Sequence, residues 1–549
     1  MPGGLLNIVS LGNNNIFLTG NPTKTFFKAV YSKYTNFGLQ KFRLDYEGQR
    51  DLRLTEPSTF TFRVKRYAEL LMDTYLVVNL PDIWSPIYNP NSNTNNKWSP
   101  YCFKWIKNLG TLMIQEITIT CGSLTLQKYT GDYLLSLVER DFTSEKKDLY
   151  NRMTGNIPEL NDPSNTNNRT NIYPNAYYTD FQAGSEPSIR GRTLYIPINT
   201  WFTLDAKCAF PLISLQYNEL IINVTLRPIQ ELFQVRDIFN MKYNNPYIQP
   251  DFNLAQFQMC RFLQTPPSIQ SDISFYTNTT STWNTDVHLL CTYCFLSNDE
   301  ARLFAEEDQA YLIKDVFRYE FQNITGTSRV GLTSNGMICN WMWYLQRDDV
   351  KMRNEWSNYT NWPYSGIPSN VITAPNNNKI GLFNGYGPYL NPDTQQNTNI
   401  FITGNFATYN RKEILETMGI ILDGEYRENT LTRGVYDYVE KYTRTNGSAR
   451  EGLYCYNFCL NSNAAEYQPS GAINLSKFKN VDLEISTFIP QVDLTNSNYG
   501  IICDGSGNLI GINKQNWQLY KYNYNMVLFE ERYNILSFMS GNCGMMYAR

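Results

Sequence analysis

The densest group of side chains that could do chemistry is His288, Cys291 and Cys294, in the run VHLLCTYCF. Imidazole and thiolate groups three residues apart bind Zn²⁺ well when a helix brings them to one face. The Val, Leu, Tyr and Phe content of this run favours a strand, where residues three apart point to opposite faces. A second pair, Cys455 and Cys459, would share a strand face but has no neighbouring His or third Cys. We therefore predict that both groups are structural and that neither holds a metal.

Nucleophilic catalysis and phosphate binding find little support in the sequence. His288 is the only histidine, so every Ser-His-Asp or Cys-His system would have to use it, and no partner motif surrounds it. The run GNPTKT, Gly20–Thr25, lacks the second glycine of a P-loop, and GSGNLIG, Gly505–Gly511, is typical of a hairpin turn. No pair of carboxylates stands out. We predict no catalytic, cofactor-binding or metal-binding residues and a protein that is not an enzyme.

Composition excludes further classes of protein. The chain has 549 residues, with 47 Lys and Arg against 50 Asp and Glu, so it lacks the cationic excess that direct nucleic-acid binding requires. A 15% aromatic share supplies a substantial core and excludes wholesale disorder. No run approaches the ~18 apolar residues of a membrane-spanning helix, and the first residues lack the basic flank of a secretory signal. Eleven cysteines are an odd and sparse set, typical of buried thiols in a reducing compartment such as the cytosol.

The dominant hydrophobic period is two, which predicts strands with one buried face. It recurs from about residue 40 to the C-terminus, with clear examples in Thr59–Arg66, Leu220–Leu226, Phe317–Phe321 and Val481–Ser486. The protein is therefore predicted to be mainly β.

Helical signals are few and local. Ser297–Glu300 (SNDE) fits a capping box and predicts a helix through ARLFAEEDQAYLIKDVF, in which Leu303, Phe304 and Tyr311 recur at helical spacing. A second helix is predicted from Asp132 through DYLLSLVERD, and a short third one after Ser144.

Long polar insertions separate the strands at 85–100, 156–188 and about 355–403. Their Asn, Gly, Pro and Ser predict surface loops, which are either tolerated decoration or an exposed tower that faces a partner. The passage 235–255 is a candidate linker between two β-rich halves. Each half has its own Trp residues, Trp105 and Trp201 in the first half and Trp341 and Trp343 in the second. The sequence shows no residue-level repeat, so a duplication of the halves would have to be visible in the structure alone.

Seven ordered segments resemble one known family, the major capsid proteins of nucleocytoplasmic large DNA viruses, and the start resembles its mimivirus-like and algal-virus branch. Two residues depart from the family pattern: Lys477 stands where Arg is usual, and Ala310 replaces a residue that is often acidic. The segments are Gly3–Val9, Leu18–Phe37 (LTGNPTKTFFKAVYSKYTNF), Leu194–Phe202 (LYIPINTWF), Phe210–Leu226, Asn298–Ile313, Gln468–Phe478 (QPSGAINLSKF) and the C-terminal YNILSFMSGNCGMMYAR.

The resemblance implies an all-β fold of two tandem eight-stranded antiparallel jelly-roll sandwiches, with long loops and a few short helices. We expect an N-terminal arm at 1–36, a first jelly roll at 37–240, a linker at 241–256 and a second jelly roll at 257–549. The family also implies a homotrimer with a six-sided outline that tiles an icosahedral shell. The expected partners are neighbouring capsomers, minor capsid proteins beneath the shell and glycans on outer loops, and the expected location is the virion capsid, assembled in the host cytoplasm.

Individual segments receive narrower interpretations. The arm residues Phe26, Phe27 and Tyr31 are candidate anchors of a tie beneath the shell, with an ordinary first strand of the sandwich as the alternative. Gln468–Phe478 is interpreted as a structural corner rather than a binding site.

Among the Asn-x-Ser/Thr triplets, Asn168 and Asn358 are the glycan candidates in predicted surface loops. Two rival functions remain: a carbohydrate-binding or carbohydrate-processing β-sandwich with an aromatic cleft and converging carboxylates, and a minor capsid or vertex protein.

Overall fold

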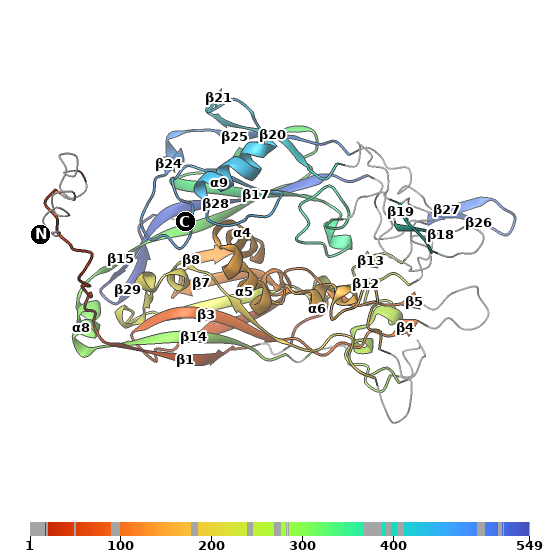
Figure 1. Cartoon of the computed structure of the whole chain (residues 1–549), viewed down its shortest axis with the longest axis horizontal. Helices are drawn as coiled ribbons and strands as arrows, with labels where there is room; N and C mark the ends of the chain where they lie inside the picture. The colour runs from red at the N-terminus through yellow and green to blue at the C-terminus, as the bar shows by residue number, and fades with distance from the viewer. Residues whose placement is uncertain are drawn as a thin grey trace, which may run out of the picture.

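Two antiparallel sandwiches follow one another along the chain (Figure 1). The prediction of a mainly β protein with few short helices is confirmed. The computed structural model describes residues 17, 20–48, 51–88, 99–176, 185–238, 245–267, 276–280, 283, 285–366, 387–390, 397–402, 411–490, 500–513, 519 and 521–547.

The first sandwich, here called the first module, packs a sheet of order β1-β14-β3-β10, with β9 also on β3, against a sheet of order β2-β11-β7-β8. We number the strands of the module in chain order and count β9 and β10 together as the sixth strand. The two sheets then have the strand orders 1-8-3-6 and 2-7-4-5, which is jelly-roll connectivity. The bounds are β1 (Phe37–Asp45), β2 (Ser58–Arg63), β3 (Leu70–Asn79), β7 (Ile114–Cys121), β8 (Leu124–Tyr129), β9 (Thr193–Pro197), β10 (Phe210–Pro211), β11 (Leu220–Leu226) and β14 (Val287–Leu296).

The second module repeats this order, with β15-β28-β17-β23 in one sheet and β16-β25-β20-β21 in the other. Strand β22 also pairs with β20, so β21 and β22 together count as the fifth strand. Strands β24 and β29 pair with β17 and β28 and extend the β15-β28-β17-β23 sheet. The bounds are β15 (Gln309–Phe321), β16 (Thr327–Leu332), β17 (Met337–Arg347), β20 (Leu415–Leu422), β21 (Glu425–Tyr426), β22 (Leu431–Thr432), β23 (Leu453–Asn457), β24 (Ile473–Asn474), β25 (Val481–Thr487), β28 (Tyr524–Met539) and β29 (Asn542–Met545).

Both modules carry a helical insertion between their fifth and sixth strands. In the first it holds α4 (Gly131–Asp141) and α5 (Ser144–Thr154), and in the second it holds the π-helical turn η11 (Val435–Val439) and α9 (Glu440–Arg444). Equal strand order and an equal insertion point are typical of duplicated modules. The remaining short helices are α3 (Leu109–Met113), α6 (Pro158–Asn161), α7 (Trp201–Leu204) and α8 (Asn298–Glu306).

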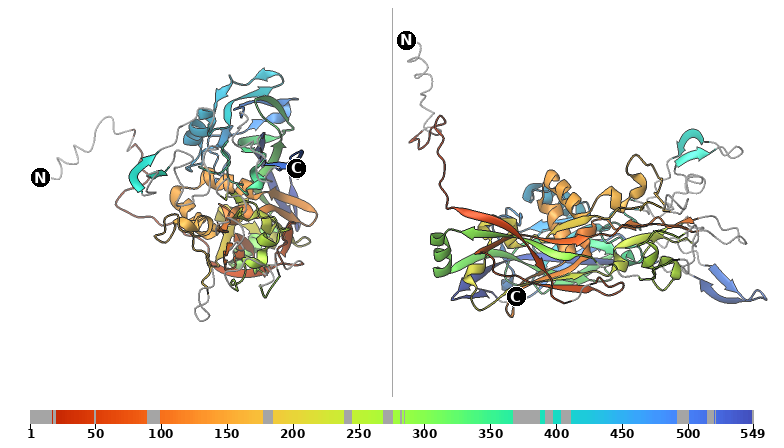
Figure 2. Two further views of the ribbon diagram at one scale, coloured as in Figure 1. Left: turned by 90° about the vertical axis from the view of Figure 1, so that its right-hand side faces the viewer. Right: turned by 90° about the horizontal axis from the view of Figure 1, so that it is seen from below.

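The two ends of the elongated molecule differ (Figures 1 and 2). At one end, the hairpin end, lie small sheets built within the long connections of both modules. At the opposite end, the arm end, lie α8, the β28–β29 turn and the N-terminal segment. The small sheets comprise β4 (Ile87–Tyr88) with β5 (Ser99–Pro100), β6 (Lys104–Trp105) with β12 (Phe233–Arg236) and β13 (Tyr247–Ile248), β18 (Gly387–Leu390) with β19 (Asn397–Ile402), and β26 (Gly500–Cys503) with β27 (Leu509–Asn513).

The helix predictions are confirmed for α4 and α5 and wrong beyond Glu306. Ser297 occupies the N-cap of α8, but its side chain makes no capping hydrogen bond. The helix ends at Glu306 and Tyr311 lies in β15, which pairs residue by residue with β28 from Gln309 to Phe321. Strand pairing over this length, with apolar side chains to bury, outweighs the helix preference of the sequence.

The expected domain limits need correction at one boundary. Strand β14 falls in the range assigned to the second jelly roll, but it hydrogen-bonds to β1 and β3 and completes the first module. The expected linker, 241–256, lies within the connection from β11 to β14, where β13 pairs with β12. Strand β1 begins at Phe37, and the described residues 20–36 before it form no helix or strand.

The four tryptophans named from the sequence are buried. Trp105 and Trp201 belong to a large apolar cluster that continues from the first module into the second, whereas Trp341 and Trp343 belong to a second cluster inside the second module.

We predict that Trp343→Ala destabilises the second module by about 3–5 kcal/mol, because it empties a fully buried site. The measurement is denaturant unfolding followed by tryptophan fluorescence. Tyr442→Ala is the control, since the Tyr442 side chain is 91% exposed and its removal should leave the unfolding midpoint unchanged. Equal effects of the two substitutions would contradict the assignment of the second core.

Candidate functional site

The histidine and cysteines singled out in the sequence lie on β14, as the strand prediction requires. Cys291 belongs to the large apolar cluster and Cys294 to a separate small one, so their thiols are buried in different places. Burial raises the pKa of Cys291 to about 12, and burial and the charge of Arg43 lower the pKa of His288. Among the described residues, no group of three or more His, Cys, Asp or Glu could hold a metal ion.

The other sequence candidates are also dispersed. Cys455 is buried in β23, whereas Cys459 lies beyond the end of that strand. Gly20–Thr25 belongs to an exposed segment. Gly505–Gly511 follows β26 and runs into β27, which confirms the hairpin turn, and the Asp504 carboxylate accepts hydrogen bonds from the Ser506 and Asn508 amides.

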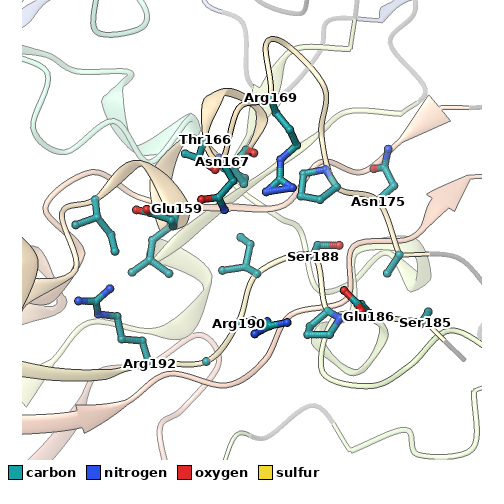
Figure 3. A pocket seen from close by; sticks show the side chains of 18 residues that line it. Glu159, Thr166, Asn167, Arg169, Asn175, Ser185, Glu186, Ser188, Arg190 and Arg192 are labelled. Carbon is teal, nitrogen blue, oxygen red and sulfur yellow. Dashed lines mark hydrogen bonds between the residues drawn. The ribbon is translucent and has the colours of Figure 1, made fainter.

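A cavity of about 740 Å³ opens beside α6 (Figure 3). Its 18 lining residues include Glu159, Arg169, Glu186 and Arg190, and the two glutamates reach it from different sides. Among these described lining residues there is neither Trp nor Tyr. The cavity therefore lacks the aromatic platform that the carbohydrate-binding alternative requires.

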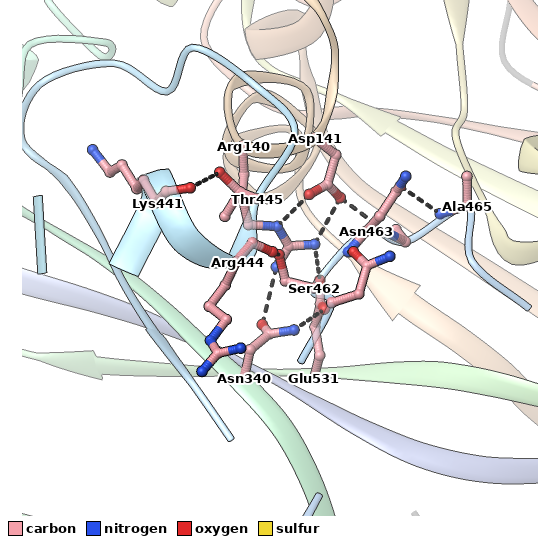
Figure 4. Close-up of polar contacts among 12 residues, drawn as sticks. Arg140, Asp141, Asn340, Lys441, Arg444, Thr445, Ser462, Asn463, Ala465 and Glu531 are labelled. Atoms are coloured by element: carbon pink, nitrogen blue, oxygen red, sulfur yellow. Dashed lines mark hydrogen bonds and ion pairs between the residues drawn. The ribbon is translucent and has the colours of Figure 1, made fainter. Parts of the chain in front are cut away.

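A buried polar cluster joins the modules, and we call it the joint. It comprises Tyr133, Arg140 and Asp141 of α4 with Asn340 of β17 and Glu531 of β28. Figure 4 labels four of them, Arg140, Asp141, Asn340 and Glu531. The guanidinium of Arg140 donates to both Asp141 carboxylate oxygens at 2.7 and 2.8 Å. It also donates to Asn340 Oδ1 at 3.0 Å and to Glu531 Oε1 at 3.1 Å. Tyr133 Oη and Asn340 Nδ2 each donate to the Glu531 carboxylate at 2.7 Å. One cation of the first module is thus neutralised partly by the second.

The backbone closes around the same cluster. The carbonyl oxygen of Arg140 accepts a hydrogen bond from the Gly447 amide, 2.8 Å away, just after α9. A Cβ on Gly447 would lie 2.4 Å from that oxygen, so only glycine permits the approach. The two equivalent helical insertions therefore meet at the joint.

Burial and neighbouring charges shift the pKa values of Glu531 and Arg140 in opposite directions. Burial alone would raise the pKa of Glu531, but the positive charges of Arg140 and Lys314 and its hydrogen bonds hold that pKa below its ordinary value. Burial would lower the pKa of Arg140, but Asp141 and Glu531 raise it well above its usual range. Both groups are therefore ionised at neutral pH.

Aromatic contacts extend the joint on its apolar side. Tyr133 of α4 packs edge-on against Phe529 of β28, with ring centroids 5.6 Å apart. Toward the arm end, Phe210 packs against Phe538 at 5.2 Å. The modules thus share one continuous core rather than a polar surface contact.

Sequence analysis did not identify the joint. Its signal is the pair Glu530-Glu531 followed by Arg532 inside a mostly apolar run, MVLFEERYNILSF. Consecutive acids in a strand point to opposite faces. Glu531 reaches the joint, and Glu530 accepts from Trp341 Nε1 inside the second module. The partner Arg140 is remote in sequence, so no local pattern connects the two.

The N-terminal segment 20–36, here called the arm, is the most exposed apolar stretch of the described chain. The exposed fractions of Phe26, Phe27 and Tyr31 are 104%, 98% and 86%, and Val30 and Tyr34 are similarly exposed. The arm contains Lys24, Lys28 and Lys33 and no acidic residue. Large exposed apolar side chains rimmed by polar ones mark interaction sites.

The segment Gln468–Phe478 makes local and strand contacts. Ile473 and Asn474 form β24, which pairs with β17, and the Asn474 side chain accepts from the Ser476 amide. Ser476 Oγ in turn accepts from the Gly336 amide at 2.7 Å. These bonds support its interpretation as a structural corner.

We predict that Glu531→Gln destabilises the protein at pH 7 by about 3 kcal/mol, because it removes half of a buried ion pair. Since the folded state holds the pKa of Glu531 below its ordinary 4.5, that stabilisation is complete above pH 4.5 and is lost as the pH falls. The variant should therefore lose less stability than the wild type between pH 6 and pH 3, as measured by urea unfolding. Glu306→Gln, in an exposed pair with Arg302, is the control and should match the wild type. Parallel pH profiles of Glu531→Gln and the wild type would contradict the assignment.

The described chain contains no helix that is long and apolar enough to cross a membrane. Known proteins resemble the chain along its length. A family model for the N-terminus of major capsid proteins matches residues 25–296, and one for the major capsid protein of large eukaryotic DNA viruses matches residues 300–544. The first match ends where β14 ends.

Individual relatives agree with these matches. The major capsid protein of Phaeocystis pouchetii virus is 24% identical and that of Paramecium bursaria Chlorella virus 1 is 23% identical, each over 100% of both chains. The major capsid protein of Chrysochromulina ericina virus is 28% identical over 63% of this chain and 58% of its own length.

Solved structures share the fold. The PBCV-1 protein whose crystal structure was fitted into a reconstruction of the virophage Sputnik has a TM-score of 0.61 and 18% identity, covering 96% of this chain and 100% of that one. The Faustovirus major capsid protein has a TM-score of 0.59 and 13% identity, covering 98% and 99%. With a family match on each module and a double jelly-roll fold, the chain belongs to the major capsid proteins of the nucleocytoplasmic large DNA viruses.

Proposed function

We propose that this protein builds the shell of a large DNA virus as a homotrimer whose copies tile an icosahedral capsid. The observation that carries the proposal is the match of consecutive capsid-protein family models to the two jelly rolls. Two modules of equal connectivity in each chain give a threefold assembly six similar sides, which suits hexagonal packing. Membership of a structural family supports construction rather than catalysis as its role.

The difference between the two ends supports an orientation in the shell. Long connections of both modules build the small sheets of the hairpin end, and the arm leaves from the opposite end. In our proposal the hairpin end faces outward and the arm end faces the interior. We further propose that the protein is assembled in the host cytoplasm and that its final location is the virion capsid.

The arm is the proposed tie to minor capsid proteins beneath the shell. As an ordinary first strand it would pair in a sheet, but residues 20–36 carry no strand. Its exposed rings and lysines call for a partner with an apolar groove and an acidic rim. The chain has a net charge of -3 and so lacks the cationic excess that direct binding to the genome requires.

The two glycan candidates differ in their exposure to solvent. Asn168 is exposed, with φ of 63°, in the loop after α6. Asn358 is 1% exposed, and its side chain bonds to the Trp362 carbonyl and to Thr360. This burial argues against Asn358 as a glycan site, so our proposal keeps Asn168 as the candidate.

We predict that the purified protein has three times the 63.7 kDa mass of one chain and a six-cornered outline. Mass photometry and negative-stain class averages at micromolar concentration measure both properties. A stable monomer that binds oligosaccharides would instead support the carbohydrate-binding alternative. A few copies per virion, counted by quantitative mass spectrometry, would favour the minor capsid alternative.

We predict that combining Phe26→Ser, Phe27→Ser and Tyr31→Ser leaves the unfolding midpoint and the trimer intact, because these side chains contribute nothing to the core. The same variant should lose incorporation into complete shells when co-expressed with the other virion proteins, as scored by cryo-electron microscopy. Tyr442→Ser, equally exposed but outside the arm, is the control. Normal shells from the triple variant would exclude the arm as a tie.

A further inference from the structure

Two cysteines from distant parts of the sequence lie together at the contact between the modules. Cys121 is the last residue of β7 and is 2% exposed, and Cys543 is half-buried in β29. Cys543 packs against the apolar cluster to which Cys121 belongs, and each thiol is close enough to the other to shift its pKa. Both are free thiols in this structure.

A single loop, Gln216–Glu219, fixes the turns that carry these thiols. On one side, the Gly541 carbonyl accepts from the Gln216 amide at 2.9 Å, and Asn542 Oδ1 accepts from Asn218 Nδ2 at 3.0 Å. On the other side, the Gly122 amide donates to the Glu219 carbonyl at 3.2 Å. Each cysteine is thus next to a residue anchored on the same loop.

Two glycines, Gly122 and Gly541, allow the two turns to approach the Gln216–Glu219 loop closely. Gly122 and Gly541 have φ of +59° and +78°, in the left-handed region. A Cβ on Gly122 would lie 2.5 Å from Asn218 Oδ1, and one on Gly541 would lie 2.9 Å from the Gln216 Cβ. The turns cannot move away from the loop without breaking these contacts, so the thiols are held near each other.

We propose that Cys121 and Cys543 form an intramolecular disulfide when the folded protein meets a small disulfide oxidant such as oxidised glutathione. The bond would fasten the C-terminal hairpin of the second module, β28–β29, to the β2-β11-β7-β8 sheet of the first module. This inference depends on the fold alone and goes beyond the proposed shell function.

The environments of the two thiols set the order of reaction. Cys121 is 2% exposed and Cys543 is half-buried, so a dissolved oxidant reaches the Cys543 sulfur first. The neighbouring Cys121 thiol also lowers the pKa of Cys543, whereas Cys543 and burial raise the pKa of Cys121. Cys543 is therefore the attacking thiolate and Cys121 the resolving thiol.

The exchange balances in two steps. The Cys543 thiolate attacks one sulfur of oxidised glutathione, forms a mixed disulfide and releases a glutathione thiolate. The Cys121 sulfur then attacks the Cys543 sulfur, the second glutathione leaves, and the Cys121 proton passes to a released thiolate. Two protein thiols are oxidised by two electrons, and one glutathione disulfide is reduced to two thiols.

The test exposes the full-length protein to oxidised glutathione, followed by non-reducing peptide mapping with mass spectrometry. We expect one cross-linked peptide pair that joins Cys121 to Cys543, and a melting temperature raised by about 2–4 °C. Cys121→Ser should retain glutathione on Cys543, and Cys543→Ser should abolish the cross-link. Cys503→Ser removes an exposed cysteine outside the pair and should leave the cross-link unchanged.

Three results would overturn the proposal. The first is stable glutathione on Cys543 in the wild-type protein without a link to Cys121. The second is a cross-link of either cysteine to another partner. The third is no reaction at Cys543 under conditions that modify Cys503.

Discussion

A guanidinium without access to water must find its acceptors inside the protein, and Arg140 finds them on both modules. Removing a charge from water costs several kcal/mol, and only good geometry with further hydrogen bonds offsets this cost. If the modules slid against each other, Arg140 would lose Glu531 and Asn340 while remaining buried. The polar joint therefore contributes orientation, and the apolar side chains around it contribute burial.

The equal connectivity of the modules explains why the joint lies where it does. In each sandwich the connection between the fifth and sixth strands carries helix, and in both it turns toward the other module. Arg140 at the end of α4 then meets Gly447, just after α9. An insertion at the same topological point in both halves thus supplies both sides of one contact, so the second half is not merely a copy placed beside the first.

Local periodicity accounts for what the sequence predicted well. Strands β2, β11 and β25 alternate buried and less buried residues as their sequences do, and α4 and α5 have clear boundaries. The misses involve information that is not local. Residues 309–317 have helical spacing but pair with β28, more than two hundred positions away. Strand β14 follows a long connection, so its membership of the first module depends on pairing with β1 and β3. Arg140 and Glu531 are likewise joined only by the fold. Asn358 does lie in a loop, but its side-chain amide turns inward to the Trp362 carbonyl, which the local sequence does not show.

The hairpin of β26 and β27 illustrates how one end of the molecule can change while the other stays constant. Its turn is closed by its own residues, through Asp504 and the amides of Ser506 and Asn508. It lies at the opposite end of the molecule from the arm, and no joint residue comes from it. Such a tip tolerates inserted sequence, so it is a place where related chains can differ without disturbing the joint.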